Sequence, residues 1–331
     1  MEEVVSTAMV TNPVYIFFIV LVIILLAPMC LNRLKIPHII GMIVAGLIIG
    51  PYGIHILDRD SSFEIFGQVG LLYLMFLAGI EIDMYHMRQN LKRGLGFGAY
   101  TFIIPMILGV VASMWLLNFD LLTAILLASM YASHTLISYP IVSRFSINKY
   151  STVVVSITGS IITEFAALIV LAVVVGVYSE GGFNIWGVVK LFVSLVVYCV
   201  AILLIYPRLA RWFFKKYNDS VMQYVFVLAL VFLASSVAHL IGLESVLGAF
   251  FAGLVLSRYI PSVSPLMNRI EFVGNALFIP YFLIGVGMLI DLKSVVSSWE
   301  TIYVAINMVV VATLCKWIAA YLTQKTFGMS K

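Results

Sequence analysis

The chain is a succession of apolar runs, most of them long enough to cross a lipid bilayer as helices. About 20 apolar residues are needed for one crossing, because a helix rises about 1.5 Å per residue and the hydrocarbon core is about 30 Å thick. Of the 331 residues, 63% are hydrophobic and 10% are charged, whereas a soluble domain carries about 25% charged residues. The sequence therefore predicts an all-α polytopic integral membrane protein.

Eleven membrane spans are predicted, and the loops between them differ sharply in charge. The spans are placed at residues 14–31, 36–50, 65–83, 95–117, 121–145, 152–177, 185–206, 220–241, 245–258, 271–290 and 302–326. The odd-numbered loops and the C-terminal tail hold fifteen lysines and arginines, whereas the even-numbered loops hold only Arg59 and Lys293. Because cytoplasmic loops are enriched in lysine and arginine, we expect the N-terminus outside and the C-terminus in the cytoplasm. The membrane is expected to be the cytoplasmic membrane of a prokaryote.

Two short motifs recur with a nearly constant offset. Gly41–Leu47 in the second span resembles Gly248–Leu254 in the ninth, and Phe76–Gly79 in the third resembles Phe282–Gly285 in the tenth, at offsets of 207 and 206. The predicted directions of the paired spans are opposite, which is typical of the inverted repeats of secondary transporters. The alternative is chance recurrence of the small residues that mediate helix packing in membranes.

The fifth span has a polar, proline-containing inner half. Pro140 lacks an amide proton and clashes with the preceding turn, so it frees backbone carbonyls within the membrane. Ser133, Thr135 and Ser138 add hydroxyl oxygens to the same segment. Free carbonyls and hydroxyls are hard ligands that suit a small alkali cation. The alternative is an ordinary proline kink whose serines bond back to the helix.

Glu164 lies midway along the apolar sixth span, and Lys316 lies inside the eleventh. A charge at that depth costs from about 2.5 to over 10 kcal/mol, and such groups commonly line ion pathways or proton relays. Glu164 can hold a cation or a proton but not both, and Lys316 can neutralise it when neither is bound. A structural ion pair without a transport role is the alternative. The sequence contains no nucleophile constellation, phosphate loop or cofactor motif, and no basic cluster suited to nucleic acid.

Four stretches together resemble the monovalent cation:proton antiporter family, specifically its second large branch, which includes sodium/proton antiporters and glutathione-gated potassium efflux proteins. These stretches are Arg33–Pro51, Gly70–Asp83, Leu247–Gly253 and Phe282–Met288. The resemblance covers nearly the whole chain. It implies a homodimer in which a core domain moves against a dimerisation panel, and a fold of thirteen helices with discontinuous crossing helices.

The resemblance also assigns residues. The family's cation-binding acid falls on Glu164, the position before it on Thr163, the unwound crossing segment on 132–140, and the lysine paired with the acid on Lys316. Most members have Asp-Asp or Asn-Asp where this chain has Thr163-Glu164, so the stoichiometry of exchange and its electrogenicity are not fixed by the resemblance. Glutamate is also one methylene longer than aspartate, which shifts the site.

The repeat and the resemblance together predict a division of the chain. The expected parts are a scaffold or dimerisation panel at 1–92, a core with ion-transport helices at 93–177, a linker helix at 178–218, a second-repeat scaffold at 219–298 and the start of a second-repeat core at 299–331. The offset of 207 maps the fifth span to about residue 332. We therefore expect at least two further helices after Lys331, and a cytoplasmic domain beyond them is left open.

The resulting hypothesis is a secondary transporter that exchanges Na⁺ or K⁺ for H⁺ by alternating access. It is not expected to be an enzyme or to use a cofactor. The expected site residues are Glu164, Thr163, Thr135, Ser138 and Ser133, with Lys316 as the charge partner and Pro140 at the helix break. Two alternatives are kept: a sodium-coupled symporter of organic anions with the same general fold, and a non-transporting membrane sensor or assembly module.

Overall fold

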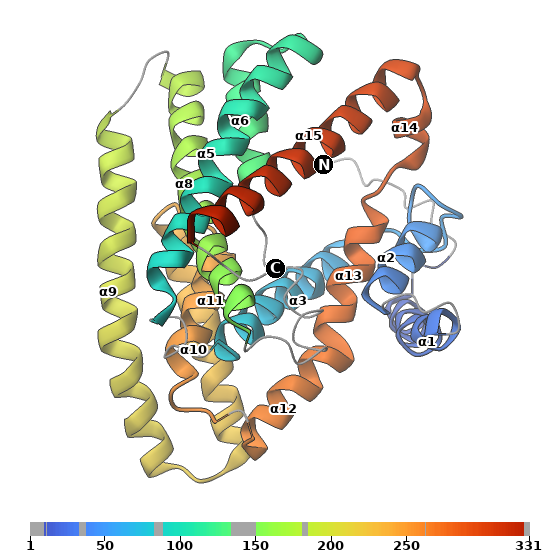
Figure 1. The fold of residues 1–331 in the computed structure, drawn as a ribbon. Coiled ribbons are helices and arrows are strands. Elements are labelled where there is room, and N and C mark those ends of the chain that lie inside the picture. Colours follow the sequence, from blue (N-terminus) through green and yellow to red (C-terminus); the bar gives the residue numbers. More distant parts are fainter. Residues whose placement is uncertain are drawn as a thin grey trace. The chain divides into compact units, whose positions relative to one another are not determined.

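The computed structural model describes residues 10, 12–32, 38–82, 89–133, 150–180, 185–261 and 263–327. The chain forms two compact units, one of Met1–Leu77 with Val263–Ile302 and the other of Ala78–Ser262 with Tyr303–Lys331. The described residues fold into helices without a strand (Figure 1). The helices are α1 Pro13–Asn32, α2 His38–Ile49, α3 Ser61–Ile80, α5 Leu91–Leu116, α6 Leu121–Ala132, α8 Ser151–Glu180, α9 Ile185–Lys216, α10 Ser220–Leu240, α11 Ser245–Leu256, α12 Pro265–Val273, the π-helix η2 Gly274–Phe278, α13 Ile279–Met288, α14 Leu292–Val296 and α15 Trp299–Phe327.

Each of the eleven predicted spans contains an apolar helix, so the predicted all-α membrane architecture is confirmed. Within the described part of the chain, seven helical segments are long and apolar enough to cross a membrane. Shorter apolar helices account for the first, second, fifth and ninth spans. The second and ninth are separate helices rather than parts of their neighbours.

The predicted end of the seventh span at residue 206 is wrong, because α9 continues to Lys216. The basic residues after Pro207 were assigned to a loop, but they lie on a helix whose aromatic side chains pack. The ring of Phe213 stacks on Phe226 of α10 with centroids 3.9 Å apart. Lys216 covers the Trp212 ring at 5.6 Å. The basic side chains after Pro207 thus lie on a continuous helix that ends at Lys216.

In the first unit, α2 and α13 pack with their backbones in direct contact. A Cβ atom on Gly46 would collide with the carbonyl oxygen of Ile284, and one on Gly287 would collide with that of Ile43. Only glycine permits this approach. An aromatic cluster lies in the same unit, in which the Tyr281 ring meets Phe63 at 5.2 Å and Phe66 at 5.1 Å between centroids.

In the second unit, α5 packs against α6 and α8. Its buried face is a row of small residues, together with a proline, spaced three or four apart: Gly94, Gly98, Thr101, Pro105, Gly109 and Ser113. The long helix α9 runs beside α10 and α11 (Figure 1). Two buried tyrosines fix α9 to α10, since the hydroxyls of Tyr198 and Tyr206 donate to the carbonyls of Ala234 and Leu230 at 2.9 and 2.7 Å.

The predicted inverted repeat has a counterpart in these contacts. Ile43 and Phe250 are 207 positions apart, which is the offset of the first motif pair. The Ile43 carbonyl lies against Gly287, and the Phe250 carbonyl lies against Gly79. Helix α2 of the first repeat thus packs on α13 of the second repeat. In the same manner, α11 of the second repeat packs on α3 of the first. This exchange is what a pair of inverted repeats produces.

Candidate functional site

The helix α6 that begins the predicted fifth span is far shorter than a full crossing. It has 12 residues, about 18 Å, and ends at Ala132. At Ser133 the backbone is extended, with φ −65° and ψ 138°, and its N–H donates to the Ser129 carbonyl at 3.0 Å. The predicted ligands Thr135 and Ser138 and the predicted break at Pro140 lie outside the described residues.

The other end of α6 is capped by Asp120. Its carboxylate accepts hydrogen bonds from the Thr123 backbone N–H at 3.2 Å and from the Thr123 hydroxyl at 2.5 Å. These hydrogen bonds favour the ionised form and lower the pKa of Asp120 below its usual value. The helix that leads to Ser133 therefore has a defined start as well as a defined end.

Glu164 and Thr163 lie near the middle of the 30-residue helix α8. Glu164 is half-buried, whereas Thr163 is fully buried. The Thr163 hydroxyl donates to the Ser160 carbonyl at 2.9 Å, and the Ser160 hydroxyl donates to the Ser156 carbonyl at 2.9 Å. Because each hydroxyl proton is used within the helix, the oxygen lone pairs are left as acceptors.

The packing of α5 fixes α8 in place. A Cβ atom on Gly98 would meet the Ile162 side chain at 3.0 Å, and one on Gly159 would meet the Gly98 backbone nitrogen at 3.0 Å. Gly94 lies similarly against the Thr158 side chain. These close contacts lie within about one turn of Thr163, on its N-terminal side. They hold the backbone of α8 firmly against α5 next to the candidate site.

Three other side chains act on the Glu164 carboxyl group. The Ser133 hydroxyl interacts with it, Lys316 opposes its charge, and Glu244 repels it. Lys316 is half-buried on α15 and interacts electrostatically with Glu164 in return. The ion pairs formed among the described residues do not include one between Glu164 and Lys316. Of the predicted site residues that the structure describes, Ser133 and Lys316 thus act on Glu164, and Lys316 does so without a direct salt bridge.

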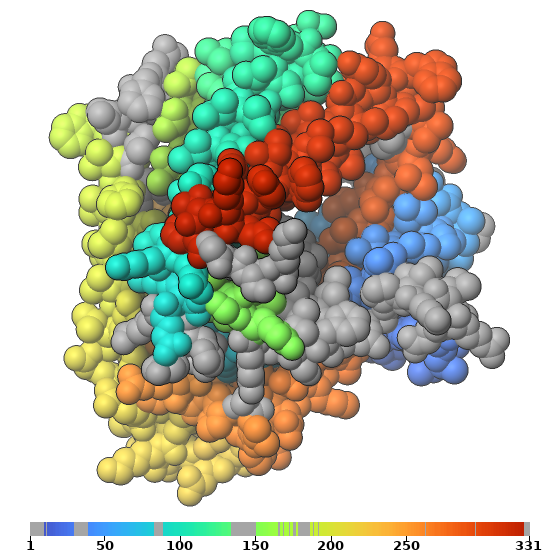
Figure 2. Space-filling model, in the orientation of Figure 1, coloured from blue at the N-terminus to red at the C-terminus, as the bar shows by residue number. Residues whose placement is uncertain are grey.

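The helix α15 that carries Lys316 is held at its far end against α5. The Tyr100 and Thr326 hydroxyls lie 3.2 Å apart, and the Phe327 ring lies against Gly96. Its buried side chains, Cys315, Ala319 and Thr323, form one row. Its other side chains are exposed or half-buried, and Figure 2 shows this helix in red on the face drawn there.

Glu244 also acts electrostatically on Glu164, although the sequence pattern alone places it at a solvated helix boundary. It is exposed and occupies the N-cap position of α11, where its side chain makes no capping hydrogen bond. The preceding turn is rigid: Gly242 has φ 82°, and the N–H groups of Gly242 and Leu243 donate to the carbonyls of His239 and Ala238 at 3.0 and 2.9 Å. These two bonds form a Schellman motif. The sequence does contain a local signal for this turn, because Gly242 lies two positions before Glu244 at the start of the short ninth span.

Among the described acids, Glu244 is the one that acts electrostatically on Glu164. Across the described residues, no group of three or more histidine, cysteine or acidic side chains could hold a metal ion. A cation here would depend on one or two carboxylates with neutral oxygens from Ser133, Thr163 and the backbone. Such a ligand set suits a weakly held monovalent ion rather than a resident metal.

Comparison with known proteins agrees with the predicted family resemblance. The model of the transmembrane sodium/hydrogen exchanger family matches residues 19–331. The Na(+)/H(+) antiporter NhaS5 of Synechocystis is 37% identical over 321 residues, which are 96% of this chain and 46% of that protein. The chain thus spans about half the length of this relative. The probable Na(+)/H(+) antiporter 3 of Methanocaldococcus jannaschii is 29% identical over 96% of this chain and 81% of its own length.

The fold is similar to that of a solved structure, the sodium proton antiporter MjNhaP1 from Methanocaldococcus jannaschii. One structure of it, at pH 8, has a TM-score of 0.66 and 17% identity, and covers 94% of this chain and 80% of that one. An electron-microscopy structure has a TM-score of 0.71 and 16% identity, and covers 97% of this chain and 80% of that one. At this identity the similarity describes the fold alone.

Proposed function

The chain belongs to the sodium/hydrogen exchanger family, and from this premise we propose that it exchanges Na⁺ or K⁺ for H⁺ across the membrane by alternating access. Both cations are kept because the relatives differ in their ion. NhaS5 is named a Na(+)/H(+) antiporter, whereas a relative from Saccharomyces cerevisiae, 22% identical over 332 residues, is named K(+)/H(+) antiporter 1.

The proposed membrane is the cytoplasmic membrane of a prokaryote, with the N-terminus outside and the C-terminus in the cytoplasm. The proposed assembly is a homodimer.

The observation that carries the proposal is the half-buried Glu164 interacting with Ser133, Lys316 and Glu244. A bare carboxylate within the membrane is expensive, and either a proton or a cation neutralises it. Competition for one acid therefore couples the two flows. The site crosses the apolar barrier at low free energy only when Glu164 is neutralised by a cation or a proton. After it has carried one ligand across, it must therefore release that ligand and bind the other before it returns.

The other residues have supporting roles. Ser133 and Thr163 supply neutral oxygens beside the carboxylate, and Thr135 and Ser138 do so from the segment outside the described residues. When neither a cation nor a proton is bound, Lys316 offsets the charge of Glu164. This lowers the free energy of the empty site between release of one ligand and binding of the next. Pro140, which lies outside the described residues, is proposed to mark the helix break. Because Lys316 forms no ion pair with Glu164 among the described residues, it does not occupy the carboxylate that the ligands would share.

The test is exchange in proteoliposomes, followed by a pH-sensitive dye after addition of Na⁺ or K⁺. Glu164→Gln should abolish exchange with both cations, because a neutral amide takes up no proton at neutral pH and carries no charge for which proton and cation could compete. Glu164→Asp should retain part of it. Glu300→Gln, which removes an exposed acid in the first turn of α15, should behave as wild type. Wild-type exchange by Glu164→Gln would refute the shared-carboxylate mechanism.

A further inference from the structure

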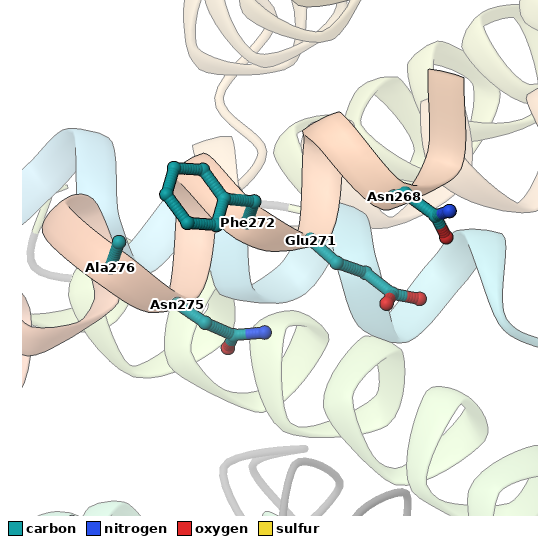
Figure 3. Close-up of a pocket in the computed structure, with 5 residues that line it drawn as sticks. All are labelled: Asn268, Glu271, Phe272, Asn275 and Ala276. Carbon is teal, nitrogen blue, oxygen red and sulfur yellow. The ribbon is translucent and has the colours of Figure 1, made fainter. Parts of the chain in front are cut away.

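A second oxygen-rich surface lies in the first unit, on α12 and η2. Asn268, Glu271, Phe272, Asn275 and Ala276 line a shallow open depression of about 560 Å³. The two amides and the carboxylate are spaced three and four positions apart, so they share one helix face. Figure 3 shows their head groups on one side of the helix, with the carboxylate of Glu271 between the two amides.

The opposite face of this helix is firmly anchored. The Tyr73 hydroxyl donates to the Ile270 carbonyl at 2.8 Å, and Met267 and Ile270 are 1% and 0% exposed. The Tyr73 ring also lies against Gly274, where a larger residue would displace it. At the start of α12, the Ser264 hydroxyl accepts a hydrogen bond from the Met267 N–H at 3.1 Å. Because the buried face of the helix is fixed, the polar face with Asn268, Glu271 and Asn275 keeps a defined position within the unit.

The backbone at this place is also irregular. In η2 the Ile279 N–H donates to the Gly274 carbonyl, five residues earlier. Pro280 follows and has no N–H to donate. The carbonyl of Asn275 or Ala276, four or five residues before Pro280, therefore lacks its helical donor. Wide turns of this kind occur frequently at functional sites.

We propose that Glu271, Asn268, Asn275 and this free carbonyl form a second binding site for a monovalent alkali cation. All four groups are hard oxygen ligands, and a single carboxylate matches a single positive charge. One carboxylate leaves a divalent ion such as calcium with an unbalanced positive charge, whereas it balances the charge of an alkali cation. The opening of the depression leaves the remaining positions to water, so the ion exchanges rapidly. Arg269 lies on the same helix but forms no ion pair with Glu271 among the described residues.

The site has a natural role in the transport cycle. In the predicted topology the tenth span begins in the cytoplasm, which places Glu271 at the cytoplasmic end of its helix. A weak site there raises the local concentration of cations at the cytoplasmic face, from which the proposed exchange would draw them. This role rests on the proposed function, whereas cation binding at α12 does not depend on it.

Binding is tested on the purified protein in detergent by the linewidth of the sodium NMR signal, which broadens when Na⁺ exchanges with a protein site. The Glu164→Gln variant removes the first site and should keep part of the excess linewidth. Adding Glu271→Gln to it should reduce the linewidth to that of protein-free detergent, whereas adding Glu300→Gln should not. Asn275→Ala in the same background should lower the excess linewidth by a smaller amount.

The outcomes separate the two proposals. Loss of broadening with Glu271→Gln but not with Glu164→Gln would support the α12 site and count against Glu164 as the shared carboxylate. Unchanged broadening when Glu271→Gln is added to Glu164→Gln would overturn the inference. In transport assays with cation supplied at the cytoplasmic side, Glu271→Gln should raise KM several-fold and leave kcat within about twofold, since the site supplies ions without taking part in the exchange.

Discussion

Glu164 could be proposed as a site residue from the sequence because a single charge inside a long apolar run is too costly to persist there without a role. Lys316 could be proposed as its charge partner for the same reason. Glu244 could not, because it lies in a turn where any acid would be solvated, and only the folding of α10 and α11 brings it near Glu164. Burial is visible in a sequence pattern, whereas proximity between distant turns is not.

The role of Thr163 can be tested by removing its oxygen alone. Thr163→Val keeps the shape of a fully buried side chain but removes the hydroxyl that bonds to Ser160. If this oxygen assists the cation, KM for Na⁺ or K⁺ should rise several-fold in proteoliposome exchange. Thr158→Val is the matched control, since Thr158 is 4% exposed and bonds to the Val154 carbonyl in the same way. Equal effects of the two substitutions would indicate a structural role only.

Glu244 should act as an attractive charge for cations approaching Glu164. Glu244→Gln removes this attraction and should raise KM for the cation several-fold on one side of the membrane only. Because Glu244 is exposed, salt screens its field, with a Debye length of about 10 Å at 0.1 M. The difference from wild type should therefore shrink when choline chloride is added. A difference that persists at high salt would mean that Glu244 contacts the ion directly.

At the scale of elements, the sequence predicted which segments form helices. It did not predict where α9 ends or that a π-helical turn, η2, interrupts the tenth span. The uniformly apolar pattern of a membrane helix has no strong period, so only charges and prolines mark its ends. The basic end of α9 is helical because its aromatic residues pack on α10. Pro280 signals an irregular backbone near η2, but the buried contact between the Tyr73 ring and Gly274 joins residues 201 positions apart and has no local signal.

The packing of α5 on α8 depends on small residues and should fail when one is enlarged. In Gly159→Ala the new Cβ would collide with the Phe97 ring and meet the Gly98 backbone nitrogen at 3.0 Å. We expect a destabilisation of about 1–3 kcal/mol, measured by thermal unfolding in detergent. In Gly67→Ala the new Cβ meets nothing within 4 Å, so this helical substitution should be neutral or stabilise by up to about 1 kcal/mol. A stable Gly159→Ala variant would show that the two helices can separate there.

For the whole molecule, the sequence predicted the membrane class, the succession of helices and the inverted repeat. Composition, run length and motif offset are sufficient for these, because the bilayer imposes the same requirement on every span. The division into two units was not predictable in the same way. Each unit combines segments from both ends of its sequence range, and such pairings depend on glycine contacts between residues more than 200 positions apart, as with Gly46 and Ile284.

The orientation follows from loop charge alone and can be tested directly. After replacement of Cys30, Cys199 and Cys315 by serine, one cysteine is introduced either at Asn218, between α9 and α10, or at Ser298, between α14 and α15. A membrane-impermeant maleimide should label Ser298→Cys in intact cells, and should label Asn218→Cys only after the cells are opened. The reason is that four basic residues near the end of α9, Arg208, Arg211, Lys215 and Lys216, resist translocation. The opposite labelling would reverse the predicted direction of every span and move Glu271 to the outer face.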